Sequence, residues 1–428
     1  MLKLLGVAVL CTTGLVAGFQ GEFRALTQQV QVGGGTSGRV KRPGVQMSES
    51  ERKALMARAQ ALNAEDLSNL LEKAGRGDAE SQVLVGMAFQ RGQGAAKDPA
   101  RAAAWFQRAA EQGHPAGQTG LGLLYMSGDG VAKDPALGIS WFRKAAELNY
   151  ASAEGRLGWA YCTGSGVEKN PEVAMQWLSR GAEQGNPFAQ SKLGMAYSKG
   201  ECVAKDEATA LGWFRKAAEQ GDVDSLRNVA DSYQLGHGVA RDQGEAMRWY
   251  EKAAEAGDAK SQYNVGWAYM KGEGVRKDKK LAQQWLGKAS EQGDGQATYY
   301  LGLMEWDGSV PVFGGNLDAM DTLEKAAAQG NPPAAYTLGE IHAGLFKSLR
   351  ARLKRDPAEA CLWYGIAQKL VGSGNWTQQF PDVASALRND LEQKVAANNG
   401  KLKAEEKNSC EERTSQWLSA HPLPPQAK

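Results

Sequence analysis

The sequence predicts an all-α protein, a right-handed α-solenoid of about eight 36-residue helix–turn–helix repeats with a C-terminal helical cap. Tryptophans recur every 36 residues, and two sets of glycines keep the same step. Random sequence does not hold one period at three independent positions, so we interpret the chain as a repeat protein. The three sets are Trp105, Trp141, Trp177, Trp213, Trp249 and Trp285; Gly86, Gly122, Gly158, Gly194, Gly266 and Gly302; and Gly113, Gly185, Gly221, Gly257 and Gly293.

The period divides the chain into units, which we number as repeats 1 to 8. Residues 64–78 match only the second half of a unit, so we expect residues 51–78 to form a partial repeat that caps the front. Repeat 7 has Thr322 at the tryptophan position, and repeat 8 has a longer loop from Phe346 to Lys354. The units are 79–114, 115–150, 151–186, 187–222, 223–258, 259–294, 295–331 and 332–372, and together they form the predicted solenoid, 79–372.

Each unit contains start and stop signals for two helices. Helix A begins after a residue whose side-chain oxygen can accept from the free N–H groups of the first turn, and it ends at a Gly-x-Gly turn. Helix B begins at Asp-Pro, as at Asp98-Pro99 and Asp134-Pro135, where proline suits the first helical position. The predicted caps of helix A are Asp78, Asn186, Asp222, Asp258, Asp294 and Asn331.

Glycine is unusually abundant, at 52 of 428 residues, where about 7% is typical. The set beginning with Gly86 falls inside helix A, where glycine costs about 1 kcal/mol relative to alanine. We therefore expect these glycines to mark a close approach of two helices, with the repeated tryptophan in the core beside them.

The unit resembles the Sel1-like repeat, a relative of the tetratricopeptide repeat. The shared pattern is A-x-x-x-L-G-x-x-Y-x-x-G-x-G-V-x-K-D-x-x-x-A-x-x-W-x-x-K-A-A-E-Q-G, and residues 190–221 match it closely apart from Cys202. The resemblance covers about residues 64–372. It implies a scaffold for protein–protein interaction rather than a reaction, and adaptor roles that in bacteria are often at the cell envelope.

The N-terminal residues 1–18 have the pattern of a signal peptide: Lys3, an apolar run over 4–17 and a small-residue exit. The run is short for a membrane span, which needs about 20 residues. A buried N-terminal helix is the alternative, and a lipoprotein is disfavoured because Cys11 follows Leu10. We expect export to the periplasm or secretion, with no membrane span after cleavage.

The remaining segments flank the solenoid. Residues 19–50 contain the glycine cluster 33–38 and are predicted to be a flexible linker. Residues 373–428 depart from the repeat and contain two expected helices, 382–394 and 402–418. We expect these helices to cover the apolar face of the last repeat.

Four cysteines remain after the predicted signal peptide, and an oxidising compartment permits two disulfides. Cys162 and Cys202 lie in turns that stacking places side by side, so we expect them to pair. Cys361 and Cys410 would then join the last repeat to the cap. Four reduced thiols are the alternative.

Charge and motifs exclude several functions. The chain has 50 basic and 48 acidic residues, which indicates no nucleic-acid partner. The four histidines are scattered, the cysteine spacing fits no metal site, and Gly-x-Gly occurs without the other features of a dinucleotide loop. We therefore expect no catalytic residues, no cofactor and no metal.

A binding surface should vary between repeats while facing one way. Two positions of helix A, four residues apart, carry different side chains in different repeats and face the same way. In related superhelices helix A lines the concave side. The two positions are aromatic in repeats 3, 6 and 7, so a partner protein or peptide is expected here; packing between repeats is the alternative. The alternative functions are a carbohydrate- or peptidoglycan-binding module and an accessory subunit of an envelope enzyme. The candidates are Trp159, Arg227, Asp231, Tyr263, Trp267 and Tyr299.

Overall fold

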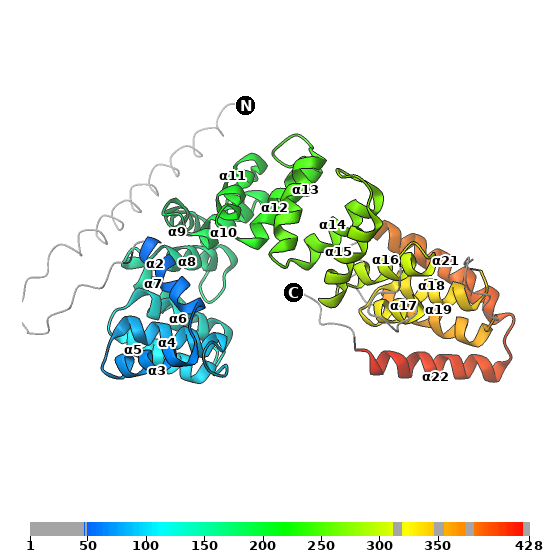
Figure 1. Ribbon diagram of the computed structural model, residues 1–428, viewed down its shortest axis with the longest axis horizontal. Coiled ribbons are helices and arrows are strands. Elements are labelled where there is room, and N and C mark those ends of the chain that lie inside the picture. Colours follow the sequence, from blue (N-terminus) through cyan, green and yellow to red (C-terminus); the bar gives the residue numbers. More distant parts are fainter. Residues whose placement is uncertain (1–46, 48, 311–318, 346–354, 373–380, 423–428) are drawn as a thin grey trace, which may run out of the picture. The chain divides into compact units, whose positions relative to one another are not determined.

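The computed structural model describes residues 47, 49–310, 319–345, 355–372 and 381–422, which form twenty helices and no strand (Figure 1). The helices follow one another as tandem pairs, so the predicted all-α solenoid is confirmed. The predicted signal peptide 1–18, nearly all of the linker 19–50 and the loop of repeat 8 lie outside the described residues.

Each of the eight repeats contributes one A helix and one B helix, and each A helix packs against the B helix that follows it. The A helices are α4 (Ala79–Arg91), α6 (Pro115–Ser127), α8 (Ala151–Thr163), α10 (Pro187–Lys199), α12 (Val223–Leu235), α14 (Ala259–Lys271), α16 (Gly295–Trp306) and α18 (Pro332–His342). The B helices are α5 (Pro99–Glu111), α7 (Pro135–Glu147), α9 (Pro171–Glu183), α11 (Glu207–Ala218), α13 (Gln243–Glu255), α15 (Lys279–Glu291), α17 (Ala319–Ala328) and α19 (Pro357–Gly372).

Four further helices flank the pairs. At the front, α3 (Ala64–Gly75) packs against α4 like the B helix of a preceding repeat, and α2 (Glu49–Gln60) also contacts α4. At the back, α21 (Pro381–Asn399) and α22 (Ala404–Ala420) both pack on α19. Helix α21 is longer than the predicted 382–394, whereas α22 has the predicted length and is shifted by two residues; both pack on the last B helix as expected.

The helix boundaries follow from the predicted capping residues. Asp78 accepts a hydrogen bond from the backbone N–H of Ser81 at 2.8 Å, and Asp98 accepts from Arg101 at 3.0 Å. At the other end of helix A, Gly92 adopts the left-handed conformation, with φ of 75°. Asn149 replaces the helix-stop glycine of repeat 2 and has φ of 61°, which asparagine tolerates better than most residues.

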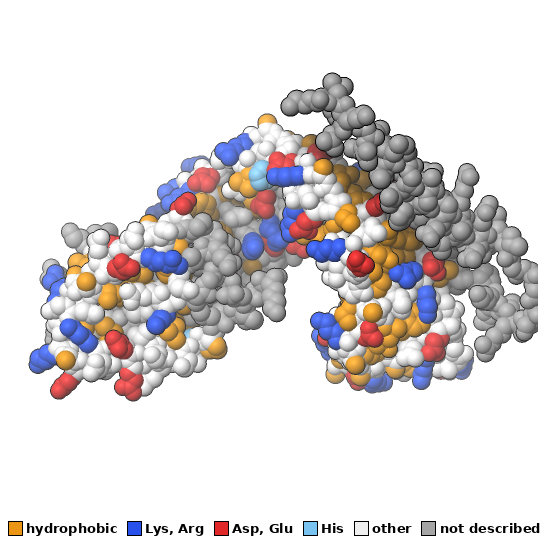
Figure 2. Space-filling view, turned by 180° about the vertical axis from the view of Figure 1, so that it is seen from behind, with side chains coloured by type: hydrophobic (Ala, Val, Ile, Leu, Met, Phe, Trp, Pro, Cys, Tyr) orange, Lys and Arg blue, Asp and Glu red, His pale blue; other side chains and the backbone are white. Residues whose placement is uncertain are grey.

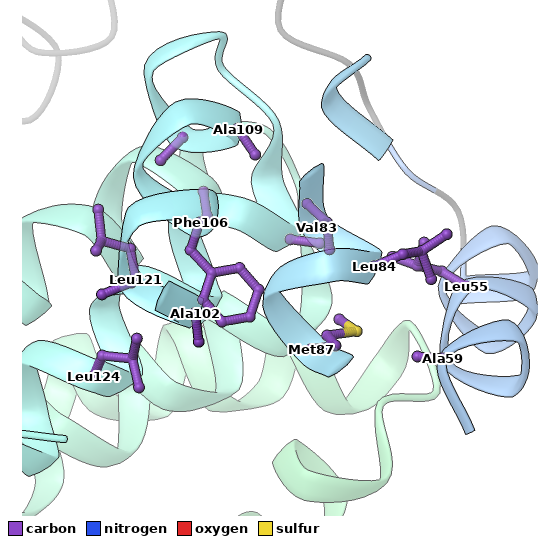
Figure 3. Packing of buried hydrophobic residues seen from close by; sticks show 14 of the residues in the cluster. Leu55, Ala59, Val83, Leu84, Met87, Ala102, Phe106, Ala109, Leu121 and Leu124 are labelled. Atoms are coloured by element: carbon purple, nitrogen blue, oxygen red, sulfur yellow. The ribbon is translucent and has the colours of Figure 1, made fainter. Parts of the chain in front are cut away.

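The glycine inside helix A permits the predicted close approach, but the partner is not the tryptophan. A Cβ atom built on Gly86 would lie 2.7 Å from the ring of Phe106, the residue after Trp105. Phe106 is almost fully buried and also packs against Gly120 of the next repeat (Figure 3). The same contact recurs between Gly122 and Phe142. The residue after each tryptophan therefore fills the core beside the glycine.

The tryptophans themselves lie at the edge of the core, so the prediction that they are core residues is wrong. All six are half-buried, and each contacts a cation three residues later on the same helix. The Nζ atom of Lys144, for example, lies 3.9 Å from the ring centroid of Trp141. A tryptophan can thus cover the core with one side of its ring while the other meets a solvated charge.

Glutamines at the ends of B helices bond to a glutamine of the same repeat, and Gln220 and Gln292 bond in addition to a backbone carbonyl of the preceding repeat. The Nε2 atom of Gln292, at the end of α15, donates to Gln262 Oε1 at 2.8 Å and to the carbonyl of Gly257 at 3.0 Å. Gln220 and Gln112 make the corresponding bonds to Gln190 and Gln82. The Glu-Gln-Gly segment therefore ends one helix and also positions the previous repeat.

Both expected cysteine pairs are bonded. Cys162 joins Cys202 with their Cα atoms 5.6 Å apart, and Cys361 joins Cys410 at 6.0 Å, both within the usual range. The first pair links the end of α8 to the turn of repeat 4. The second links α19 to α22 and so attaches the C-terminal helix to the last repeat.

Substituting Gly122 with alanine should destabilise the fold. Its Cβ would meet the ring of Phe142 at 2.7 Å, and overpacking costs about 1–3 kcal/mol, only partly offset by about 1 kcal/mol of helix propensity. We expect a net loss of up to about 2 kcal/mol in chemical denaturation. Gly212→Ala is the matched control, since this helical glycine has no neighbour within 4 Å, and it should gain up to about 1 kcal/mol. Equal effects would contradict the packing role.

Cys202 has φ of 68°, a conformation that is strained for a residue with a side chain. The free energy lost to this strain can be measured separately from the free energy gained from the disulfide. In a Cys162→Ala background, Cys202→Gly should be more stable than Cys202→Ala by about 1 kcal/mol, because glycine adopts this conformation freely. Both double variants should be less stable than the oxidised wild type by up to about 4 kcal/mol. Thermal unfolding with and without reductant measures both differences; indistinguishable double variants would contradict the argument from backbone conformation.

Candidate interaction surface

The A helices line one side of the stack. Consecutive A helices contact each other directly, as α4 does with α6, α6 with α8, α8 with α10 and α14 with α16. No comparable contact joins consecutive B helices within the described residues. The A helices therefore lie on the inner side of the stack, and we call the surface they form the inner face. The predicted binding positions lie on these helices.

Charged side chains are distributed evenly over the visible surface. Acidic and basic residues alternate across the described atoms in Figure 2, without a large patch of one sign. This agrees with the near balance of 50 basic and 48 acidic residues. The described part of the face seen in Figure 2 therefore shows no basic stripe of the kind typical of nucleic-acid-binding proteins.

In repeats 1 and 2 the positions equivalent to these candidates, at multiples of 36 residues before them, are mostly buried. Val83 is fully buried, and Met87 and Thr119 are 8% and 5% exposed. These side chains pack against neighbouring helices, so the packing alternative holds in this part of the chain. Trp159 in repeat 3 is half-buried, and the Nζ atom of Lys192 lies 5.3 Å from its ring.

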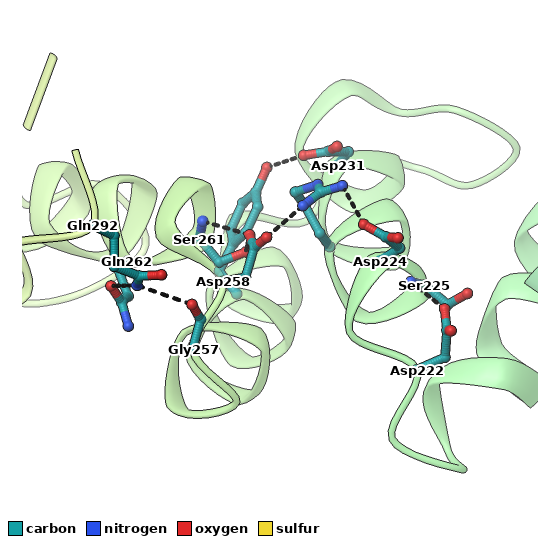
Figure 4. A network of polar contacts seen from close by, with 11 residues as sticks. Asp222, Asp224, Ser225, Asp231, Gly257, Asp258, Ser261, Gln262 and Gln292 are labelled. Carbon is teal, nitrogen blue, oxygen red and sulfur yellow. Dashed lines mark hydrogen bonds and ion pairs between the residues drawn. The ribbon is translucent and has the colours of Figure 1, made fainter. Parts of the chain in front are cut away.

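Arg227 and Asp231 are brought together, but their charges are already partnered (Figure 4). Arg227 forms ion pairs with Asp258 at 2.5 Å and with Asp224 at 2.7 Å. Asp231 accepts a hydrogen bond from the hydroxyl of Tyr250. Burial raises the pKa of the Asp231 carboxyl above 3.8, against the opposing effects of the Tyr250 hydrogen bond and Arg227. These two residues therefore connect α12 to α13 and to Asp258, the residue that caps the start of α14.

The aromatic candidates form one continuous group. The ring centroids of Tyr263 and Trp267 are 6.3 Å apart, and Trp267 meets Tyr300 edge-on at 4.7 Å. Tyr300 in turn lies 5.3 Å from Tyr299, whose hydroxyl is 3.3 Å from that of Thr337. All four rings are half-buried. We call Tyr263, Trp267, Tyr299 and Tyr300 the aromatic patch.

Tyr300 was not among the binding residues predicted from the sequence. A step of one residue turns a helix by 100°, so the residue after a surface position still borders the same face. Tyr300 is 36 residues after Asn264 and 144 after Arg156, at a position that varies strongly between repeats. Variation at this neighbouring position was the signal that could have identified it.

Polar groups also line a cavity at the C-terminal end, where α19, α21 and α22 meet. Its volume is about 430 Å³, and its walls include Lys369, Asn398, Lys407 and the Cys361–Cys410 disulfide. The Oδ1 atom of Asn398 is buried without a hydrogen-bond partner. This cavity is separate from the inner face of repeats 3 to 7.

A model of the Sel1 repeat matches seven consecutive segments: 79–114, 115–150, 151–186, 187–222, 223–258, 259–294 and 295–331. The chain belongs to the Sel1 repeat family. The matched segments have the same bounds as repeats 1 to 7.

Two solved structures illustrate the similarity. One is a protective antigen of uropathogenic Escherichia coli strains displaying an SLR fold, 25% identical, which covers 85% of this chain and 98% of that chain with a TM-score of 0.54. The other is a Sel1 repeat protein from Oxalobacter formigenes, 34% identical, covering 54% of this chain and 100% of that chain with a TM-score of 0.47. A search of curated proteins found no match.

Sel1 repeats are typical of protein-interaction scaffolds and generally form a non-catalytic fold. In the described part of this chain, no group of three or more His, Cys, Asp or Glu side chains is arranged to hold a metal ion. None of the described helices is long and apolar enough to cross a membrane. His114 is buried, which lowers its pKa, and His342 is half-buried with the same effect.

The raised pKa of Asp231 predicts a pH-dependent effect of Asp231→Asn. The folded state binds this proton more tightly than the unfolded chain, so stability decreases as pH rises from about 3.8 through the folded pKa. Asparagine does not titrate, so it removes this decrease in stability, and its side-chain oxygen can still accept the hydrogen bond from the Tyr250 hydroxyl. Relative to wild type, the variant should gain stability as pH rises from 3 to 7 in thermal unfolding. Asp129→Asn, in an exposed turn, is the control; a pH-independent difference would contradict the argument.

Proposed function

We propose that this Sel1 repeat protein is a non-enzymatic adaptor of the cell envelope that binds a protein or peptide along the inner face of repeats 3 to 7. The aromatic patch carries the proposal. Its four rings lie on two consecutive A helices, α14 and α16, with the Tyr299 hydroxyl next to Thr337 of α18, and none of the rings is fully buried. Tyrosine and tryptophan dominate the binding energy of protein interfaces because they combine large apolar area with a polar group.

An extracytoplasmic location is supported by two disulfides and by the signal-like N-terminal sequence. The similar protein of uropathogenic Escherichia coli is described as a protective antigen, a description that fits a protein accessible outside the cytoplasm. We extend this location to the present chain as part of the proposal.

Carbohydrate binding is the alternative for an aromatic surface, but the geometry favours protein. A sugar stacks on a free, flat ring face. The Trp267 ring is contacted by Lys271 Nζ at 4.7 Å and by the edge-on Tyr300. Tilted rings with polar tips suit the irregular surface of a peptide or protein better.

The test combines Tyr263→Ala with Trp267→Ala and measures capture of proteins from envelope extract, followed by affinity for the purified partner. Truncating a central aromatic residue typically costs at least 2 kcal/mol, so we expect about 30-fold weaker binding or more. Trp285→Ala is the matched control, since Trp285 is equally half-buried but lies on helix B of the same repeat. Sedimentation with purified cell-wall sacculi runs in parallel.

Three results would overturn the proposal: undiminished capture by the double variant, an equal loss in the Trp285 control, or co-sedimentation with sacculi that depends on the patch. Because the rings are half-buried, circular dichroism and thermal unfolding accompany each variant. Tyr300→Ala provides a second, smaller truncation should the double variant be poorly folded. If the captured partner is an enzyme, the protein is its accessory subunit.

A further inference from the structure

The three C-terminal helices leave a cavity between them. Helices α21 and α22 both pack on α19, but they make no comparable contact with each other within the described residues. Side chains of all three helices line the cavity, whose volume is about 430 Å³. Sites for small ligands typically measure about 300–1,000 Å³. The cavity is therefore large enough for a small ligand, with α19 as its floor and α21 and α22 as its walls.

The cavity reaches from the core to the surface. Tyr364 and Cys410 in its lining are 1% and 4% exposed. Gln368, Lys369 and Glu411, also in the lining, are exposed. A ligand can thus enter by one end while the rest of it remains in solvent.

Two contacts fix the walls relative to the floor. The Cys361–Cys410 disulfide joins α19 to α22 and itself lines the cavity. On the other side, the Nδ2 atom of Asn398 on α21 donates to the carbonyl of Pro357, at the start of α19, at 2.8 Å. The cavity is thus formed before a ligand arrives, which reduces the entropy lost on binding.

Two lysines on different helices line the cavity without a carboxylate partner. Lys369 belongs to α19 and Lys407 to α22. Neither forms an ion pair with another residue of the described part of the chain. Glu411 contributes a single negative charge against these two positive ones. The excess of positive charge favours an anionic ligand.

The wall also contains a hydrogen-bond acceptor without a donor. Asn398 is 3% exposed, and its Nδ2 atom is already bonded to the Pro357 carbonyl. A carbonyl can only accept, so this bond determines which side-chain atom of Asn398 is the nitrogen. The Oδ1 atom is buried and has no hydrogen-bond partner among the described residues. Such an atom destabilises the protein until a donor reaches it.

We propose that this cavity binds an α-amido carboxylate, the group found at the C-terminus of a peptide and in a free acylated amino acid. The carboxylate pairs with Lys369 and Lys407, and the N–H on the neighbouring carbon donates to Asn398 Oδ1. This group carries an anion and a donor within one residue, which matches the two unsatisfied features of the cavity. Val395 and the disulfide provide apolar contact for its side chain. The site goes beyond the proposed function and is separate from the aromatic patch.

The first test compares acetyl-Ala-Ala-Ala as a free acid with the same tripeptide as its C-terminal amide, in calorimetric titrations of the full chain. The acid should bind at least tenfold more tightly, because the amide loses charge-assisted hydrogen bonds to two lysines. Lys369→Gln combined with Lys407→Gln should remove this preference. Lys97→Gln combined with Lys133→Gln is the matched control, since it removes the same charge from exposed lysines of repeats 1 and 2.

The second test concerns the N–H donor. Lactate in place of the last alanine of the acid replaces this N–H by an ester oxygen. The wild type should bind the ester about three- to tenfold more weakly than the acid, the usual effect of one hydrogen bond. Asn398→Leu has a similar size but no acceptor, so it should not distinguish ester from acid.

Four results would overturn the proposal: equal affinity for acid and amide, a preference that survives the double lysine variant, an equal loss in the Lys97 and Lys133 control, or equal binding of ester and acid by the wild type. Should Asn398→Leu fail to fold, amine-specific labelling of the wild type replaces it. The acid should slow labelling of Lys369 and Lys407 severalfold and leave Lys97 unchanged. Unaltered labelling of the two cavity lysines would also overturn the proposal.

N-Acetylalanine distinguishes the two sources of the ligand. If it binds as tightly as the tripeptide, the ligand is a free acylated amino acid. If it binds at least tenfold more weakly, the preceding residues contribute and the ligand is a peptide C-terminus. The chain with Tyr263→Ala and Trp267→Ala should bind the tripeptide as the wild type does. Failure of these titrations therefore leaves the function proposed for the aromatic patch intact.

Discussion

The contact between a glycine of helix A and the large side chain opposite it on helix B is the constraint on which most of the repeats depend, the exception being repeat 5, where Ala230 replaces the glycine. Gly86 and Gly122 allow the rings of Phe106 and Phe142 to lie where any Cβ atom would stand. Helices in such close contact bury the ring almost completely. Because neighbouring repeats share the ring, as Phe106 does with Gly120, the same contact also sets the spacing of the stack. The loss of helix propensity at glycine is offset by this packing.

Because the residue after each tryptophan fills the core, the tryptophans themselves are not needed there. They lie at the boundary of the core, each with one side towards a lysine or arginine on the same helix. On the B helices, the core is thereby covered by tryptophans paired with lysine or arginine. On the inner side, each repeat keeps its backbone and changes only a few side chains. This arrangement lets one fold carry an ion-paired segment around Arg227 in repeat 5 and an aromatic patch in repeats 6 and 7.

Much of the fold was predictable from local signals. The caps Asp78 and Asp98, the left-handed turn glycines and the period of 36 residues depend on a few neighbouring residues, and the structure has them where the sequence indicated. The role of tryptophan was predicted wrongly because periodicity identifies a recurring position without saying how deep it lies. Trp105 and Phe106 recur together in phase, and only packing decides which of the two faces Gly86.

The sequence by itself determined the repeat, its two helices and the pairs of cysteines that stacking brings together, since each of these follows from residues at fixed spacing. The tertiary structure decided what the variable positions do. It buried Val83, paired Arg227 and Asp231 with other side chains of repeat 5, added Tyr300 to the aromatic patch and laid α2 against α4. The reason is physical: helix formation and capping involve neighbours within a few residues. The exposure of a side chain depends on every helix that packs around it.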